Sequence, residues 1–420
     1  MRLPGLFILF GMLSLSVSAQ RNDTWLKELL YAKGSPALKN ILDNPDTYRY
    51  QILFTQIDRD RHNQPHFRSF ALNLDRALYF NPASTVKLPT ALAALEKLNE
   101  LKVNGLNKFT PMLTDSAFGG QTSVLRDSTS ENGLPSVAHY IKKIFLVSDN
   151  DAYNRLYEFN GQQELNERLW KKGYRDVRIT RRFVPMNEEE NRHTNPVSFV
   201  KDGNFVYRQT EAVSKIRFDF SKRILLGKAY YDRSEKLVNE PMDFTRHNNF
   251  PLEDQQSILR SVMFPESVAK RKRFNLTRDD YEFLYRYMRM LPGESLVPRY
   301  DTTEFFDSYA KFFWFRATKS NIPSYLNVYS KAGWSYGFLT DNAYIADTEN
   351  RCEFLISATI YVNSDGVLND DKYDYETIGY PFFKELGEIL YQNELKRQRK
   401  YKPDLSGLAS HEKSAPNQVK

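Results

Sequence analysis

The sequence of 420 residues contains a single cysteine, Cys352. The chain therefore cannot form an internal disulfide bond, and cysteine-rich zinc sites are excluded. Cys352 stands in the apolar run 352–356, which favours a buried structural thiol over a nucleophile. The six histidines include no His-Glu-x-x-His motif. We expect neither a metal nor another cofactor.

Long apolar runs are also absent after the first twenty residues, so we expect no transmembrane anchor in the mature chain. The N-terminus combines a basic start at Arg2 with the apolar run Leu6–Val17 and small residues up to Ala19. This order is typical of a signal peptide. We predict that residues 1–19 are a signal peptide cleaved after Ala19, and that the bacterial protein is periplasmic or secreted.

Charge is not concentrated in any one part of the chain. The formal net charge is +7, but acidic residues are interleaved with Lys and Arg nearly everywhere. A solvated surface accounts for this pattern, and no nucleic-acid-binding module is present. We expect no nucleic-acid partner.

Strand-like runs at both ends of the sequence enclose a helical middle. The predicted strands are 50–57, 67–74, 326–330, 340–346 and 352–362. Helical periodicity marks 24–42, 136–172, 252–264, 277–290 and 375–396, with a further helix that opens near Ser84. The predicted fold class is α/β (α+β): an antiparallel sheet flanked by N- and C-terminal helices, plus an all-helical lobe. The active site is expected in the cleft between them.

This pattern divides the chain into predicted regions. A sheet lobe is expected from residues 20–80 and 322–397, a helical lobe from 81–200, an extended insertion or lid from 201–321, and a disordered tail from 398–420. The aromatic side chains of 201–321 are expected to form the core of that segment.

Ser84 and Lys87 are the first candidates for chemistry. Three residues apart at the start of a helix, they lie on one face with Cβ atoms roughly 5–6 Å apart. The unpaired backbone N–H groups of a helix start can also hold an oxyanion. Alone, this spacing equally fits an N-cap serine followed by a solvent-facing lysine.

Two further motifs follow along the chain. Ser148-Asp149-Asn150 comes after an apolar stretch, and Lys331-Ala332-Gly333 ends a strand-like run. Each alone is typical of a polar turn. Together and in this order, the three motifs resemble the serine β-lactamase and penicillin-binding-protein family, whose motifs are Ser-x-x-Lys, Ser-Asp-Asn and Lys-Thr-Gly. The resemblance, which is nearest to class A β-lactamases, covers residues 25–200 and 322–397.

The resemblance implies an exported serine hydrolase that acts through an acyl-enzyme on an ester or amide. The implied substrates are a β-lactam, a peptidoglycan-type peptide as for D-Ala-D-Ala carboxypeptidases, or another small-molecule or peptide acyl compound, including one derived from the cell wall. The implied catalytic residues are Ser84 as nucleophile, Lys87 as general base, Ser148 as proton relay and Lys331 as the charge that tunes them. The implied substrate-binding residues are Asn150, Gly333 and Trp334, with an oxyanion hole from the N–H groups of Ser84 and Trp334.

The sequence departs from this family at two points. Val184 falls where class A enzymes carry the glutamate that activates the deacylating water, although Glu188, Glu189 and Glu190 are close in sequence. Ala332 replaces the usual threonine or serine of the third motif, where Ser330 or Ser335 are the candidates to compensate. The alternative function is therefore a catalytically inactive binding or sensor protein with this fold.

The sequence supports a second enzyme class, the α/β-hydrolases, less well. Residues 333–337 match the Gly-x-Ser-x-Gly pattern of α/β-hydrolases, with Ser335 as nucleophile. That pattern requires a strand–Ser–helix elbow and a downstream histidine. A strand is predicted after Ser335, and the only later histidine is His411.

Overall fold

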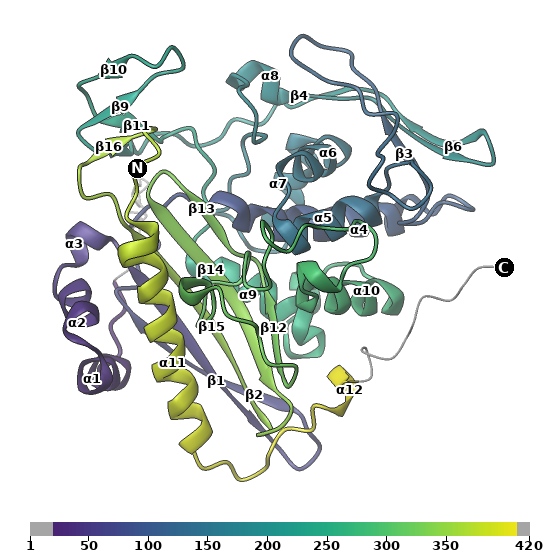
Figure 1. The fold of residues 1–420 in the computed structure, drawn as a ribbon. Helices are drawn as coiled ribbons and strands as arrows, with labels where there is room; N and C mark the ends of the chain where they lie inside the picture. Colours follow the sequence, from purple (N-terminus) through teal and green to yellow (C-terminus); the bar gives the residue numbers. More distant parts are fainter. Residues whose placement is uncertain (1–19, 410–420) are drawn as a thin grey trace, which may run out of the picture.

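The computed structural model describes residues 20–409. The predicted signal peptide, its cleavage site and residues 410–420 lie outside the described residues. The centre of the molecule is an antiparallel sheet in the order β12–β14–β15–β1–β2, with β13 paired to β14 (Figure 1). Its strands are β1 (Gln51–Arg59), β2 (Pro65–Leu72), β12 (Leu326–Ser330), β13 (Gly333–Ser335), β14 (Phe338–Asp347) and β15 (Cys352–Tyr361).

The sheet joins the two ends of the chain, because residues Gln51 to Gln56 of β1 pair with β15. Both faces of the sheet are buried. Along β15, Phe354 and Ile356 contribute to one apolar core, while Leu355 between them contributes to the other. This alternation follows from the two-residue period of a strand and allows helices to cover both faces.

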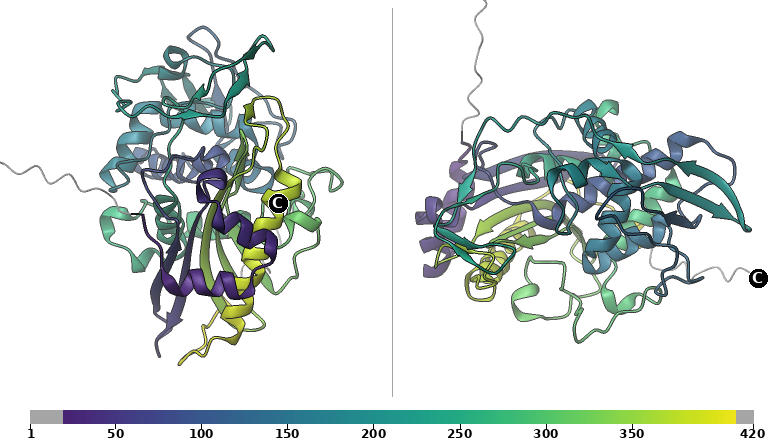
Figure 2. Two further views of the ribbon diagram at one scale, coloured as in Figure 1. Left: turned by 90° about the vertical axis from the view of Figure 1, so that its left-hand side faces the viewer. Right: turned by 90° about the horizontal axis from the view of Figure 1, so that it is seen from above.

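Terminal helices cover the first face. They are α1 (Thr24–Lys33), α2 (Pro36–Asp43), α3 (Pro45–Tyr48) and α11 (Tyr380–Lys396), which follows the short π-helix Tyr375–Gly379. Figure 2 shows the N-terminal helices and α11 side by side on the same side of the sheet, where Ser35 Oγ donates a hydrogen bond to Glu385.

The helical lobe lies against the second face. Its helices are α4 (Lys87–Leu101), α5 (Val137–Val147), α6 (Asn150–Asn160), α7 (Gln162–Lys171), α9 (Leu252–Met263) and α10 (Arg278–Arg289). Leu88, Leu92 and Leu95 of α4 are all buried. Their spacing of four and three residues places them on one helix face, as the periodicity predicts. The predicted fold class, an antiparallel sheet with terminal helices and a helical lobe, is confirmed.

Residues 201–321 contribute to several parts of this architecture. Helices α9 and α10 belong to the core between sheet and helical lobe. The aromatic residues Phe312, Phe313 and Trp314 instead pack in the core of the sheet lobe, where Phe313 lies 5.2 Å from Phe383 between ring centroids. The aromatic content of this segment therefore stabilises both lobes.

Short elements complete the rim of the molecule. They are α8 (Glu188–Arg192), α12 (Ser406–Ala409), β3 (Met112–Thr114), β4 (His193–Thr194), β5 (Val197–Lys201), β6 (Asn204–Gln209), β7 (Ala212–Val213), β8 (Leu225–Leu226), β9 (Ala229–Tyr231), β10 (Leu237–Val238), β11 (Met242–Asp243) and β16 (Val367–Leu368). No helix within residues 20–409 combines the length and apolar composition needed to cross a bilayer.

The first part of the expected tail is packed against the body of the protein. Arg399 pairs with the buried carboxylate of Glu394, and Leu405 is 6% exposed in the helical-lobe core. The polar composition of the C-terminal residues gives no sign of these anchoring contacts, so residues 398–409 differ from the expected disorder.

Candidate active site

Ser84 lies in the turn that leads into the helix of Lys87. The 3₁₀ turn Ala83–Val86 leads directly into α4, and Ala83 has a φ of +44°. This left-handed conformation costs a residue with a Cβ roughly 1–2 kcal/mol, and strain of this kind gathers at functional sites. Ser84 is half-buried and lines a cleft of about 440 Å³.

Lys87 lies beneath this cleft with none of its surface exposed. Its Nζ donates to the backbone oxygen of Ser148, to Ser148 Oγ at 3.3 Å and to Asn150 Oδ1 at 2.7 Å. The ring centroid of Phe183 lies 5.2 Å from the same Nζ. Within residues 20–409, no hydrogen bond joins Ser84 Oγ to Lys87 Nζ.

The Ser-Asp-Asn segment forms the junction between two helices. Ser148 ends α5 in the left-handed region with a φ of +60°, and Asp149 then caps α6 by accepting the N–H of Ala152 at 2.8 Å. Aspartate favours such an N-cap position because its short polar side chain satisfies a backbone N–H group. The sharp turn directs both oxygens of Ser148 toward Lys87.

Lys331 brings the third motif to the same point. It follows the edge strand β12 and is 1% exposed. Its Nζ donates to Ser148 Oγ at 2.9 Å and to Ala332 O at 2.6 Å. Ser148 Oγ therefore lies between the amines of Lys87 and Lys331.

Gly333 brings the backbone of β13 against the turn that carries Ser84. A Cβ atom at position 333 would lie 2.5 Å from Ser84 N and 3.0 Å from Thr85 N. Only glycine fits this close approach. The next residue, Trp334, lines the cleft and packs its ring edge-to-face on Tyr309 at 5.7 Å between centroids.

Burial is the main cause that lowers the pKa values of both lysines. Burial lowers the pKa of Lys87 well below its usual value, and the positive charge of Lys331 lowers it further. The negative charge of Asp149 acts in the opposite direction. Burial also lowers the pKa of Lys331 to about 7, although Asp341 acts in the other direction. A lysine with a lowered pKa can be neutral near physiological pH, as a general base must be.

Asp341 and Lys311 lie behind Lys331 and were not predicted as site residues. Burial raises the pKa of Asp341 to about 6, while its carboxylate accepts the N–H groups of Phe312 and Asn342 at 2.8 Å each. Lys311 Nζ donates to the backbone oxygens of Met288 and Val328. The available sequence signal was a charged residue inside the predicted strand 340–346.

A sequence comparison decides the family. The model of the β-lactamase enzyme family matches residues 35–245, half of the chain. The chain belongs to the β-lactamase enzyme family. Membership supports a function of the serine-hydrolase type.

Solved structures similar to this β-lactamase-family protein include two β-lactamases and PBP-A. The β-lactamase from Sphaerobacter thermophilus is 12% identical, with 85% of this chain and 96% of that chain covered and a TM-score of 0.46. PBP-A is 14% identical (89% and 97% covered, TM-score 0.44), and the β-lactamase from Streptomyces albus G is 13% identical (84% and 99% covered, TM-score 0.46). Comparison with curated proteins gives no match.

The loop opposite Ser84 in this β-lactamase-family protein carries no acid into the cleft. Val184 is a lining residue, and no Asp or Glu is among the others. The loop is anchored by Arg182, which is 1% exposed and pairs with Glu158 at 2.9 Å. Phe183 N also donates to Asn154 Oδ1 at 2.8 Å. Val184 is therefore held in position by its neighbours.

The three nearby glutamates have other partners. Glu188 pairs with Arg192 and Arg246, Glu189 lies 3.2 Å from His193, and Glu190 accepts the N–H of Asn187 in a capping box. None of the three lines the cleft. They do not replace the missing loop glutamate in this arrangement.

Of the two serines near the third motif, only Ser335 lines the cleft. Ser330 is 3% exposed, and its hydroxyl has no hydrogen-bond partner within the described part of the chain. Ser335 ends β13 and is followed by Tyr336-Gly337 and then by β14. A strand-to-strand turn is not the strand-to-helix elbow of an α/β-hydrolase.

The remaining lining residues give the cleft a positive character. Arg181, Arg182, Arg233 and His247 line it together with the amides of Asn81, Asn150, Asn248 and Asn369. Burial lowers the pKa of His247 to about 3, with a further contribution from Arg181, so this histidine is neutral. No motif or regular spacing in the sequence assigns these residues to one site.

Proposed function

We propose that this protein is an exported serine hydrolase that forms an acyl-enzyme on Ser84 with an ester or amide substrate. One observation carries the proposal: two fully buried amines, those of Lys87 and Lys331, share the hydroxyl of Ser148 directly beneath the cleft that Ser84 lines. A binding protein has no need of two buried amines whose charged forms are disfavoured by desolvation.

The roles follow from the contacts. Neutral Lys87 takes the proton of Ser84 as the hydroxyl attacks the substrate carbonyl; active-site hydrogen bonds that are absent without substrate often form when it binds. Ser148 passes a proton from the lysines to the leaving group. Asn150, which accepts from Lys87 Nζ at 2.7 Å and lines the cleft, holds the base and the substrate amide. The N–H groups of Ser84 and Trp334 stabilise the oxyanion.

The cleft favours an anionic acyl substrate. Arg181, Arg233 and the charge of Lys331 attract an anion, and no carboxylate among the lining residues opposes them. β-Lactams and the carboxyl-terminal part of peptidoglycan-type peptides both fit this description. The substrate is a small molecule or peptide of this class, including one derived from the cell wall.

Labelling with a mechanism-based probe tests the proposal. A fluorophosphonate or a labelled penicillin is expected to add one probe mass to the peptide that contains Ser84, measured by mass spectrometry after digestion. Ser84→Ala is expected to abolish the adduct. An adduct on Ser335 would instead support an α/β-hydrolase mechanism, and the absence of any adduct with either probe would support the inactive binding or sensor protein.

A second prediction concerns deacylation. Because Val184 and not a carboxylate faces the cleft, we expect the penicilloyl adduct on Ser84 to persist, and Val184→Glu to shorten its lifetime at least about tenfold, a fraction of the 10²–10⁴ that a well-placed base contributes. The decay of the adduct is followed by intact-protein mass spectrometry. Val184→Gln, of similar size but without basicity, is the matched control. Equal lifetimes for the glutamate and glutamine variants would contradict this account of the loop.

A further inference from the structure

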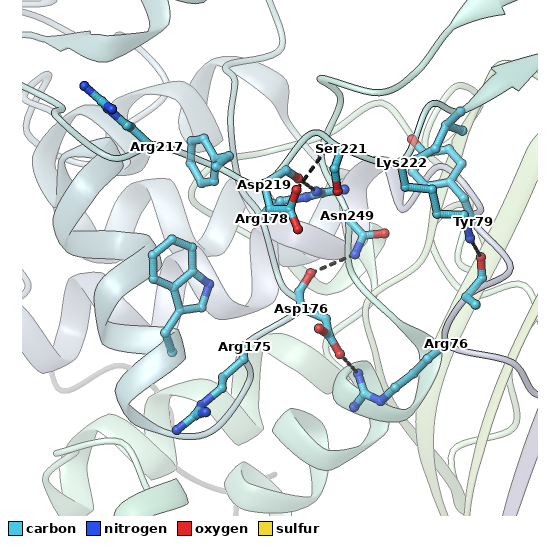
Figure 3. Close-up of a pocket in the computed structure, with 14 residues that line it drawn as sticks. Arg76, Tyr79, Arg175, Asp176, Arg178, Arg217, Asp219, Ser221, Lys222 and Asn249 are labelled. Atoms are coloured by element: carbon cyan, nitrogen blue, oxygen red, sulfur yellow. Dashed lines mark hydrogen bonds and ion pairs between the residues drawn. The ribbon is translucent and has the colours of Figure 1, made fainter. Parts of the chain in front are cut away.

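A second hollow, of about 650 Å³, lies beside the catalytic cleft. We call it the Arg178 hollow; it is lined by residues of 76–79, 170–178 and 217–224 and by Asn249 (Figure 3). It shares walls with the catalytic cleft: Arg178 and Asn249 exchange backbone hydrogen bonds at 2.9 and 2.8 Å, while nearby Arg181 and Asn248 line the cleft. None of the predicted catalytic or substrate-binding residues lines the Arg178 hollow.

Positive charge predominates in this hollow. Arg76 is neutralised by ion pairs with Asp176, Glu253 and Asp254. The other cations that line it, Arg175, Arg178, Arg217 and Lys222, have no ion pair within residues 20–409, and Asp219 is the one remaining acid of the lining. Figure 3 shows Arg175 and Arg217 on one side and Arg76 and Lys222 on the other. Because Arg76 is already paired, Lys222 is the cation on that second side that can attract an anion.

Arg178 is incompletely paired. Its guanidinium donates to the backbone oxygen of Asp219, but its buried Nε has no hydrogen-bond partner among the described residues. Burial lowers its pKa, although arginine still stays charged at neutral pH. A partly desolvated guanidinium is costly, and an anion that contacts the accessible part of Arg178 offsets this cost.

An apolar wall adjoins these cations. The half-buried rings of Trp170 and Phe218 meet edge-to-face with centroids 6.0 Å apart, and Trp170 Nε1 donates to Val177 O. The indole N–H is thus already satisfied, so the wall offers flat apolar surface. Pockets of 300–1,000 Å³ that combine such surface with a few polar groups are typical of small-molecule sites.

We propose that the Arg178 hollow is a second binding site, separate from the catalytic cleft, for a small molecule that carries a phosphate or carboxylate group beside a flat apolar ring. The anionic group pairs with Arg178 and with the exposed cations Arg175 and Arg217. The ring lies against Trp170 and Phe218. The site does not depend on Ser84.

Calorimetry with defined probes tests this site. The probes are 1-naphthyl phosphate, 1-naphthoate, inorganic phosphate and uncharged 1-naphthol, titrated into the wild-type protein and into Ser84→Ala. We expect both proteins to bind the naphthyl anions equally, and inorganic phosphate and naphthol each to bind at least about tenfold more weakly, since one lacks the ring and the other the charge. The tighter of the two naphthyl anions identifies the anionic group.

Variants at the rim keep the test independent of folding. Arg175→Gln with Arg217→Gln changes two exposed residues and is expected to weaken naphthyl anion binding about tenfold or more. Arg271→Gln, an exposed arginine that lines neither hollow, is the matched control and should bind like the wild type. Wild-type affinity in the double variant, equal weakening in the control, or no binding of either naphthyl anion would overturn the proposal. The two proposals can fail separately. If the naphthyl anions bind to Ser84→Ala, but neither the fluorophosphonate nor the penicillin labels the wild-type protein, the second binding site is supported and the proposed hydrolase is not.

Discussion

Replacing Lys87 by methionine is expected to lower the rate of Ser84 acylation by about 10²–10⁴-fold, the contribution of a general base. Methionine keeps a similar length and removes the amine, which contacts Ser148 and Asn150. The rate is measured with a chromogenic penicillin or ester under single-turnover conditions. Loss of rate with an intact thermal transition identifies a chemical and not a structural effect.

The same helix offers a matched control. Lys97, also on α4, is 8% exposed and donates to Phe159 O and Glu164, away from the catalytic cleft. Lys97→Met therefore removes a buried amine without touching the site. It should lower the thermal transition and leave the acylation rate near the wild-type value. Wild-type acylation by a folded Lys87→Met would mean that another group activates Ser84.

The pH profile of acylation follows from the two lowered pKa values. The rate rises as Lys87 loses its proton and falls as Lys331, with a pKa lowered to about 7, loses its positive charge. Because the two amines share Ser148 Oγ, the apparent values belong to the pair. Lys331→Arg keeps the charge at all relevant pH values, so the alkaline fall should move upward in that variant.

The meeting of the three motifs could be predicted from the sequence. Ser84 opens a helix that follows the first hairpin, and Lys331 ends a strand that joins the same sheet, so an antiparallel sheet with one helical lobe leaves them at a common edge. The hydrophobic periods of 2 and 3.6 residues predicted these elements and the fold class, whereas the resemblance to the β-lactamase and penicillin-binding-protein family implied that the three motifs share one cleft. Hydrophobic periodicity does not predict that the two lysines are buried. Their burial depends on Phe183 and on the turn at Ser148, and neither has a periodic signal.

The surroundings of the site were less predictable for the same reason. Asp341 lies within a strand that is buried on both faces, so alternation does not tell which side its carboxylate takes. The aromatic run 312–315 lacks helical or strand periodicity, yet Phe312 packs between Trp334 and Phe383 at 5.9 and 5.5 Å between centroids. It thereby supports the tryptophan at the cleft edge. Such contacts join segments that only the folded chain brings together.

Gly333→Ala is expected to reduce acylation about 10²–10³-fold, the effect of losing one oxyanion-hole donor. A Cβ at this position would lie 2.5 Å from Ser84 N, and backbone cannot yield as a flexible side chain does. The strand β13 must then move away from the turn at Ser84, which separates the N–H groups of Ser84 and Trp334. The acylation rate and the thermal transition are both measured, and both should fall.

Gly119→Ala provides the matched control for this substitution, because no atom lies within 4 Å of a Cβ built at that exposed glycine. It should leave the rate and the thermal transition near the wild-type values. We expect Lys87 and Ser148 to keep their contacts when β13 shifts. A partial loss of the acylation rate in Gly333→Ala would therefore measure oxyanion stabilisation separately from proton transfer. Wild-type acylation by Gly333→Ala would show that the N–H groups of this strand have no part in the reaction, and the oxyanion would then have to be held by the helix start at Ser84 alone.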